Sequence, residues 1–80
     1  MFKNEVVSML EELVGNWSTD KDDIQDMVAD VMEDAGVDFC AEDFGDYVSI
    51  QFEDDDENDE EVIVQYELVG RNTWTVVRVF

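Results

Sequence analysis

The spacing of the apolar residues changes once along this chain of 80 residues, and the change limits the folds that it can adopt. Up to Gly36, apolar side chains recur every three or four residues, which is the period of an amphipathic helix. From Tyr47 onward they recur at every second residue, as in a strand with one buried face. Helices followed by strands are typical of an α+β domain.

Two helices are expected in the first half of the chain. The apolar residues from Phe2 to Trp17 fall on one side of a helix, and Gly15 marks its expected end. A second helix is expected to follow Thr19, which would cap it with Asp22 three residues on, and to stop at Gly36. The apolar stripe of this second helix consists of Ile24, Met27, Val28, Val31, Met32 and Ala35.

Three strands are expected after the helices, over residues 47–53, 61–68 and 73–80. Their short connections favour an antiparallel meander. The segment 37–46 is expected to be irregular, with an extra short strand around residues 37–40 left open. Residues 1–80 are therefore predicted to form a single acidic α+β domain, with two N-terminal helices packed on one face of a three-stranded antiparallel meander sheet.

The register of the last hairpin decides which residues of the final strand are buried. A turn of even length would place Val77 and Val79 on the buried face beside Val64 and Tyr66, because a shift by one residue would bury Arg78. The outer face would then carry more apolar side chains than a free surface needs, and it is a candidate surface for a partner or for a homodimer. Its members are Tyr47, Ile63, Trp74 and Val76.

The chain carries 23 Asp and Glu residues against 4 Lys and Arg, a formal net charge of −19. So large a charge destabilises a compact domain by self-repulsion. It also excludes direct binding of nucleic acid and of anionic membrane surfaces. No apolar run approaches the roughly 20 residues of a membrane span, and the N-terminal segment lacks the apolar core of a signal peptide. A cytoplasmic protein is expected.

The residue types offer little for catalysis. There is no histidine to activate a nucleophile, and the single cysteine, Cys40, is expected to be a small buried hydrophobic residue. A calcium-binding loop starting at Asp54 fails, because Asp59 stands where that loop needs glycine and Gln65 stands where it needs glutamate. We therefore expect no enzymatic activity, no cofactor and no dedicated metal site.

The acidic residues gather in two stretches of sequence. Eight of the nine residues from Glu53 to Glu61 are acidic, and a second group falls along one face of the second helix. Carboxylates three or four residues apart on a helix lie about 5–6 Å apart, so their row resembles the phosphates of a nucleic acid. We expect two anionic tracks, with Tyr47 and Trp74 as aromatic anchors for a partner. The helix track consists of Asp22, Asp23, Asp26, Asp30, Glu33 and Asp34, and the loop track of Asp54, Asp55, Asp56, Glu57, Asp59 and Glu60.

In its small size, extreme acidity and charge layout, the whole chain resembles the acidic DNA-mimic inhibitors of phages, among them anti-CRISPR and anti-restriction proteins. The resemblance implies a stoichiometric inhibitor in the host bacterial cytoplasm. Its partner would be a basic nucleic-acid-binding protein or complex: a CRISPR effector, a restriction enzyme, a nuclease or a histone-like protein. Two alternatives remain open, an immunity protein or antitoxin that blocks a basic nuclease toxin, and an acidic adaptor or structural protein.

Overall fold

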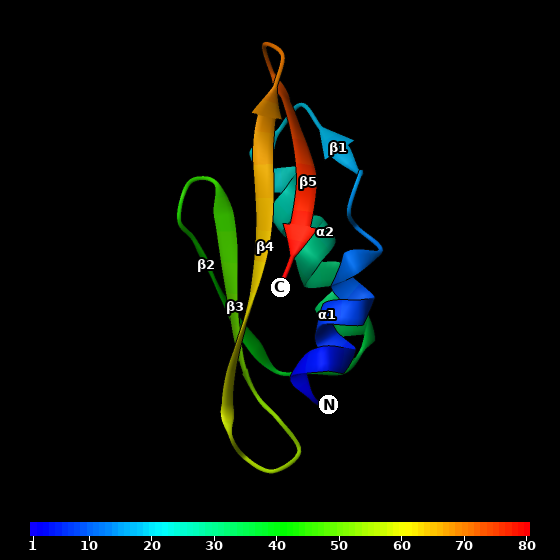
Figure 1. The fold of residues 1–80 in the computed structure, drawn as a ribbon, viewed down its shortest axis with the longest axis vertical. Coiled ribbons are helices and arrows are strands. Elements are labelled where there is room, and N and C mark those ends of the chain that lie inside the picture. The colour runs from blue at the N-terminus through cyan, green and yellow to red at the C-terminus, as the bar shows by residue number, and fades with distance from the viewer.

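A computed structural model describes all of residues 1–80 as two helices packed against a five-stranded antiparallel sheet (Figure 1). The α+β class therefore agrees with the sequence. The strands lie side by side in the order β1-β5-β4-β3-β2, and the sheet is curled rather than flat. The elements in chain order are α1 (Lys3–Glu11), β1 (Trp17–Ser18), α2 (Lys21–Asp34), β2 (Phe39–Asp43), β3 (Tyr47–Glu53), β4 (Asp59–Val69) and β5 (Thr73–Val79).

The prediction of a three-stranded meander sheet is wrong. The meander is present as β3, β4 and β5, but β1 and β2 extend it by one strand at each edge. β2 arises from the segment expected to be irregular: Gly45, at φ 102°, allows the tight turn that folds residues 39–43 back along β3. Its sequence, FCAED, has no apolar alternation, because only Phe39 reaches toward the core. The apolar pattern therefore offers little sign of a strand here.

The first helix ends earlier than predicted, at Glu11 instead of at Gly15. Gly15 adopts φ 91° and turns the chain toward β5, where its N–H donates to the Val76 carbonyl at 2.9 Å. Trp17 and Ser18 consequently form β1. The second helix is capped by Asp20, not by Thr19, since the Asp20 carboxylate accepts a hydrogen bond of 2.9 Å from the Asp22 N–H.

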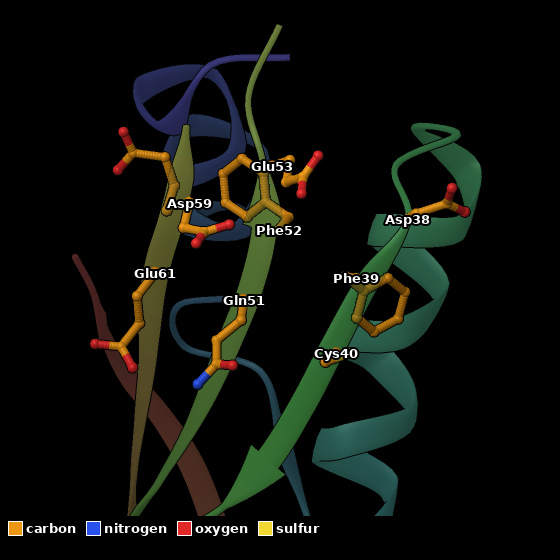
Figure 2. A pocket seen from close by; sticks show the side chains of 9 residues that line it. Asp38, Phe39, Cys40, Gln51, Phe52, Glu53, Asp59 and Glu61 are labelled. Atoms are coloured by element: carbon orange, nitrogen blue, oxygen red, sulfur yellow. The ribbon is translucent and has the colours of Figure 1, made fainter. Parts of the chain in front are cut away.

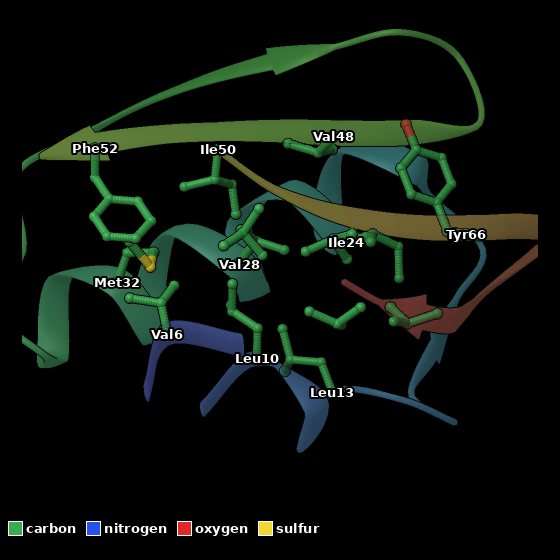
Figure 3. Close-up of a cluster of buried hydrophobic side chains, with 14 residues drawn as sticks. Val6, Leu10, Leu13, Ile24, Val28, Met32, Val48, Ile50, Phe52 and Tyr66 are labelled. Atoms are coloured by element: carbon green, nitrogen blue, oxygen red, sulfur yellow. The ribbon is translucent and has the colours of Figure 1, made fainter. Parts of the chain in front are cut away.

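Fourteen buried apolar residues form one core between the helices and the sheet (Figure 3). The helices contribute one residue per turn to it, among them Leu10, Ile24 and Val28, as the helical period requires. β3 and β4 contribute every second residue. The full set is Val6, Leu10, Leu13, Ile24, Val28, Met32, Val48, Ile50, Phe52, Val62, Val64, Tyr66, Val76 and Val79.

The predicted register of the last hairpin is wrong for half of β5. Val64 pairs with Val79 as expected, but an irregularity between Gln65 and Tyr66 shifts the ladder, so Tyr66 pairs with Val76. A β-bulge of this kind inserts one residue and changes which side chains share a face. Val76 is buried and Trp74 packs against the core, so neither belongs to the outer face as predicted.

Candidate protein-binding surface

The exposed face of α2 carries the predicted helix track. All six of its acidic side chains are exposed. Asp23 accepts a hydrogen bond of 2.7 Å from the Ser18 hydroxyl, and the other five carboxylates accept none. Because the helix has 14 residues, the row runs along roughly 21 Å of a stiff element. It can therefore present a line of fixed, unpaired negative charges.

Almost none of the negative charge is neutralised within the molecule. Only two ion pairs form: the N-terminal ammonium with Asp55, and Lys21 with Asp43 at 3.3 Å. Lys21 is the only basic residue of α2, and its ammonium lies 5.4 Å from the ring centre of Trp74, against the sheet. The exposed face of the helix consequently has no cation of its own.

The last turn of α2 holds acidic residues where the helix itself favours basic ones. Glu33 and Asp34 end the helix, and no basic residue occupies that turn. The carbonyl end of a helix carries partial negative charge, so each anion there is unfavourable by about 0.3–1 kcal/mol at low ionic strength. These two charges therefore do not serve the stability of α2.

The acidic connection between β3 and β4 has a defined conformation. The Asp54 carboxylate accepts hydrogen bonds of 2.9 Å from the N–H groups of Asp56 and Asn58, and the Asp54 N–H donates to the Asn58 carbonyl. The Asn58 N–H, more than any other group, lowers the pKa of Asp54. Glu57 adopts φ 64°, a left-handed conformation that favours glycine. Asp54 thus shapes the loop, and the other carboxylates project from it.

The two acidic tracks meet at one end of the molecule. A hollow of about 480 Å³ is lined by Met1, by residues 35–38 just after α2, and by residues 53–55 at the start of the loop. Asp55 lies here with the N-terminal ammonium. The helix track therefore ends close to the start of the loop track.

The two proposed aromatic anchors occupy different settings. Tyr47 is half-buried and stacks on the exposed ring of Phe44, with ring centres 4.9 Å apart. Trp74 meets the Tyr66 ring edge-on at 5.4 Å and lies under the Lys21 ammonium, so it packs on the core side of the sheet. Both rings are half-buried, and Trp74 is the one that packs against the core.

The sequence patterns missed a polar cluster around Asp43. Its carboxylate accepts hydrogen bonds from the Tyr66 hydroxyl at 2.6 Å, the Gln25 amide at 2.8 Å and the Gly45 N–H at 2.9 Å, and it pairs with Lys21. The Tyr66 bond above all lowers the pKa of Asp43, while burial chiefly raises the pKa of Tyr66. In the sequence, only Tyr66 indicated such a cluster, because it places a hydroxyl group at a strand position that was predicted to be buried.

Other features of the chain show no reactive or metal-binding arrangement. No group of three or more acidic, cysteine or histidine side chains is placed to hold a metal ion. Cys40, predicted to be buried, is exposed on β2. Neither α1 nor α2 has the length and apolar character needed to cross a bilayer.

Comparison of the chain with protein-family models, with curated proteins and with solved structures finds no match.

Proposed function

We propose that this protein is a stoichiometric DNA-mimic inhibitor, which occupies the nucleic-acid-binding surface of a basic protein or complex in the cytoplasm. The target class that fits is a nucleic-acid-binding defence protein, such as a CRISPR effector or a restriction enzyme, and the protein would be the phage-encoded antagonist. It acts by binding alone, without catalysis or a cofactor.

The observation that supports this proposal most is that acidic residues occupy positions where the fold favours other residues. Glu33 and Asp34 lie at the carbonyl end of α2, and Glu57 holds a backbone conformation that suits glycine. A protein that needed charge only for solubility could place it elsewhere on its surface at no such cost. The retained carboxylates instead lie on two ordered elements that adjoin at one end, which supports a role in binding.

Binding would resemble the binding of a protein to DNA, with the carboxylates of this chain in place of the phosphates. Arg and Lys side chains of the target that normally contact phosphates would contact Asp26, Asp30 and Glu33 on α2, and Asp56 and Asp59 on the loop. Each contact releases counterions, so the affinity should fall steeply as salt rises. Tyr47 and its neighbour Phe44 offer apolar contact area beside the charges.

A pair of matched variants tests whether position or total charge matters. In the first, three carboxylates of the helix track are neutralised; in the second, three exposed carboxylates outside the tracks are neutralised, so that both have the same net charge. The track variant is Asp26→Asn, Asp30→Asn, Glu33→Gln. The control variant is Glu11→Gln, Glu12→Gln, Glu67→Gln.

Binding is measured by capture of target protein from a bacterial lysate on each immobilised variant. The proposal expects the track variant to lose capture, while the control variant retains it. Equal loss in both variants would mean that the chain binds through its net charge alone, and this would count against a mimicry surface. An immunity protein or antitoxin would instead hold one nuclease toxin as its sole partner.

A further inference from the structure

β2 leaves one edge of the sheet open. It is the terminal strand of the order β1-β5-β4-β3-β2, and its four residues from Cys40 to Asp43 are exposed. The opposite edge is covered where Gly15 and Asn16 bond to Val76 of β5 and continue into the two-residue β1. β2 is therefore the longer accessible edge.

The register identifies which backbone groups of β2 point outward. Phe44 N–H donates to the Tyr47 carbonyl at 2.9 Å, and antiparallel pairs alternate between bonded and non-bonded positions. Cys40 and Glu42 therefore bond to β3, while Phe39 and Ala41 direct their N–H and C=O groups away from the sheet. None of the backbone hydrogen bonds of turns, loops and caps involves Phe39 or Ala41.

A groove lies across the ends of β2, β3 and β4, so it is on the β3 side of β2 and not at its open edge (Figure 2). Its volume is about 570 Å³. Cys40 and Gln51 are paired across β2 and β3, and both line the groove. The side of the groove nearest the edge is therefore made by the small side chain of Cys40. The groove also holds the acidic residues Asp38, Glu53, Asp59, Glu60 and Glu61.

The charge of this region determines which strand can add to the edge. A second copy of this chain, at −19, would bring Glu42 and Asp43 against their own equivalents, and like charges on adjacent strands are destabilising. Charged residues on an edge strand oppose pairing with strands of like charge, and Glu42 and Asp43 have this effect on β2. The acidic residues of β2 and its outward backbone groups together favour a basic extended segment.

We propose that β2 binds an extended basic segment of a partner protein, which adds to the sheet as a sixth strand. Its backbone would bond to Phe39 and Ala41, and alternate side chains would lie on the groove side. Arg or Lys at those alternate positions would lie beside Asp38 and Glu42, which share a face of the sheet with Cys40. The segment expected is therefore one with a basic residue at every second position. This interaction is separate from the DNA-mimic function and does not depend on it.

Three synthetic ten-residue peptides test the proposal, with alternating sequences Arg-Thr, Arg-Pro and Glu-Thr. Arg-Pro has the charge of Arg-Thr but lacks half of the backbone donors, and Glu-Thr has the same strand preference with opposite charge. Amide hydrogen exchange of Phe39 and Ala41 is followed as each peptide is added to the full protein. Arg-Thr should slow exchange at both amides and bind about tenfold or more tighter than Arg-Pro, and Glu-Thr should not bind.

The variant Ala41→Pro removes one outward donor without touching the β3 ladder, because proline is tolerated at an edge strand whose N–H faces solvent. It should weaken Arg-Thr binding, whereas Ala41→Ser should not. If Arg-Thr and Arg-Pro bind equally, or if no β2 amide gains protection, strand addition is wrong. The peptides leave the protein unmodified, so the peptide comparison remains decisive even if Ala41→Pro disturbs the fold. No nucleic-acid-binding target takes part, so the result is also independent of the mimicry test.

Discussion

The Tyr66 hydroxyl donates a hydrogen bond of 2.6 Å to the Asp43 carboxylate, and this contact connects the middle of β4 to the end of β2. Lys21 and Gln25 reach the same carboxylate from the first turns of α2. One acidic residue out of 23 is thus held by four partners, while most of the others have none. Asp43 connects α2, β2 and β4, whereas Asp20 and Asp54 bond only within their own cap and loop.

Loss of the Tyr66 hydroxyl should therefore destabilise the fold. Tyr66→Phe keeps the buried ring but removes a donor to a charged acceptor, and we expect the free energy of unfolding to fall by about 1–2 kcal/mol. Urea denaturation measures the change. Tyr47→Phe is the control, because the Tyr47 ring stacks on Phe44 and its hydroxyl makes no hydrogen bond; it should shift stability by less than about 0.5 kcal/mol. Equal effects in the two variants would contradict the role assigned to Asp43.

The Asp43 cluster should also give a pH-dependent contribution to stability. The Tyr66 hydrogen bond, with Gly45 and Lys21, lowers the folded-state pKa of Asp43 below its ordinary value of 3.8. The ionised form is thus favoured in the fold, so its contribution is present above pH 3.8 and is lost as pH falls through the folded pKa. The free energy of unfolding is measured for the native protein and for Asp43→Asn from pH 6 down to pH 2. Their difference separates the effect of Asp43 from the loss of repulsion as the other carboxylates are protonated. The difference in stability should close below about pH 4, and a constant difference would show that Asp43 does not titrate in this way.

Charge reversal along α2 should have opposite effects at its two ends. Glu33→Lys or Asp34→Lys replaces an anion at the carbonyl end of the helix and should raise stability by about 0.3–1 kcal/mol at low salt. Asp22→Lys makes the same change of net charge in the first turn, where an anion is favourable, and should stabilise less or destabilise. Melting temperatures in low-salt buffer distinguish the ends. If all three variants behave alike, only net charge matters and the helix-end interpretation fails.

Replacement of Glu57 by glycine should stabilise the loop. Glu57 holds φ 64°, and glycine adopts this conformation without the penalty of about 1 kcal/mol that a side chain adds. Asp56→Gly removes the same charge from a neighbouring position with ordinary backbone, so it should give no such gain. The midpoint of chemical denaturation measures both. A loss of stability in Glu57→Gly would mean that the side chain supports the loop instead of projecting from it.

Much of the fold could be predicted from periodicity. The stripe of α2 and the alternation of β3 and β4 place Ile24, Val28, Ile50 and Val64 in the core, because burial of one face imposes those spacings. β1 and β2 could not be found in this way. Trp17 continues the helical spacing of the residues before it, and β2 buries too little to show alternation.

The sequence predicted which residues make the surface acidic, but not which of these residues have a structural role. The spacing of the residues alone placed the helix carboxylates on one exposed face, because the helical period groups them on one side and their charge keeps that side in water. It did not distinguish Asp54, which is used inside its own loop, from Asp56 and Glu57 beside it. The register shift between Gln65 and Tyr66, which leaves Val77 of β5 without a partner, has no local sequence pattern, so the alternation could not show that Trp74 faces the core.

The most direct test of DNA mimicry is competition for the captured target. The tagged protein is used to capture partners from a bacterial lysate, and bound proteins are then eluted with excess double-stranded DNA or, as a control, with an uncharged polymer. We predict that DNA, but not the polymer, releases one nucleic-acid-binding protein or complex, and that raised salt without DNA releases the same partner. Retention of the partner in the presence of DNA, or capture of a partner that binds no nucleic acid, would contradict the mimicry proposal.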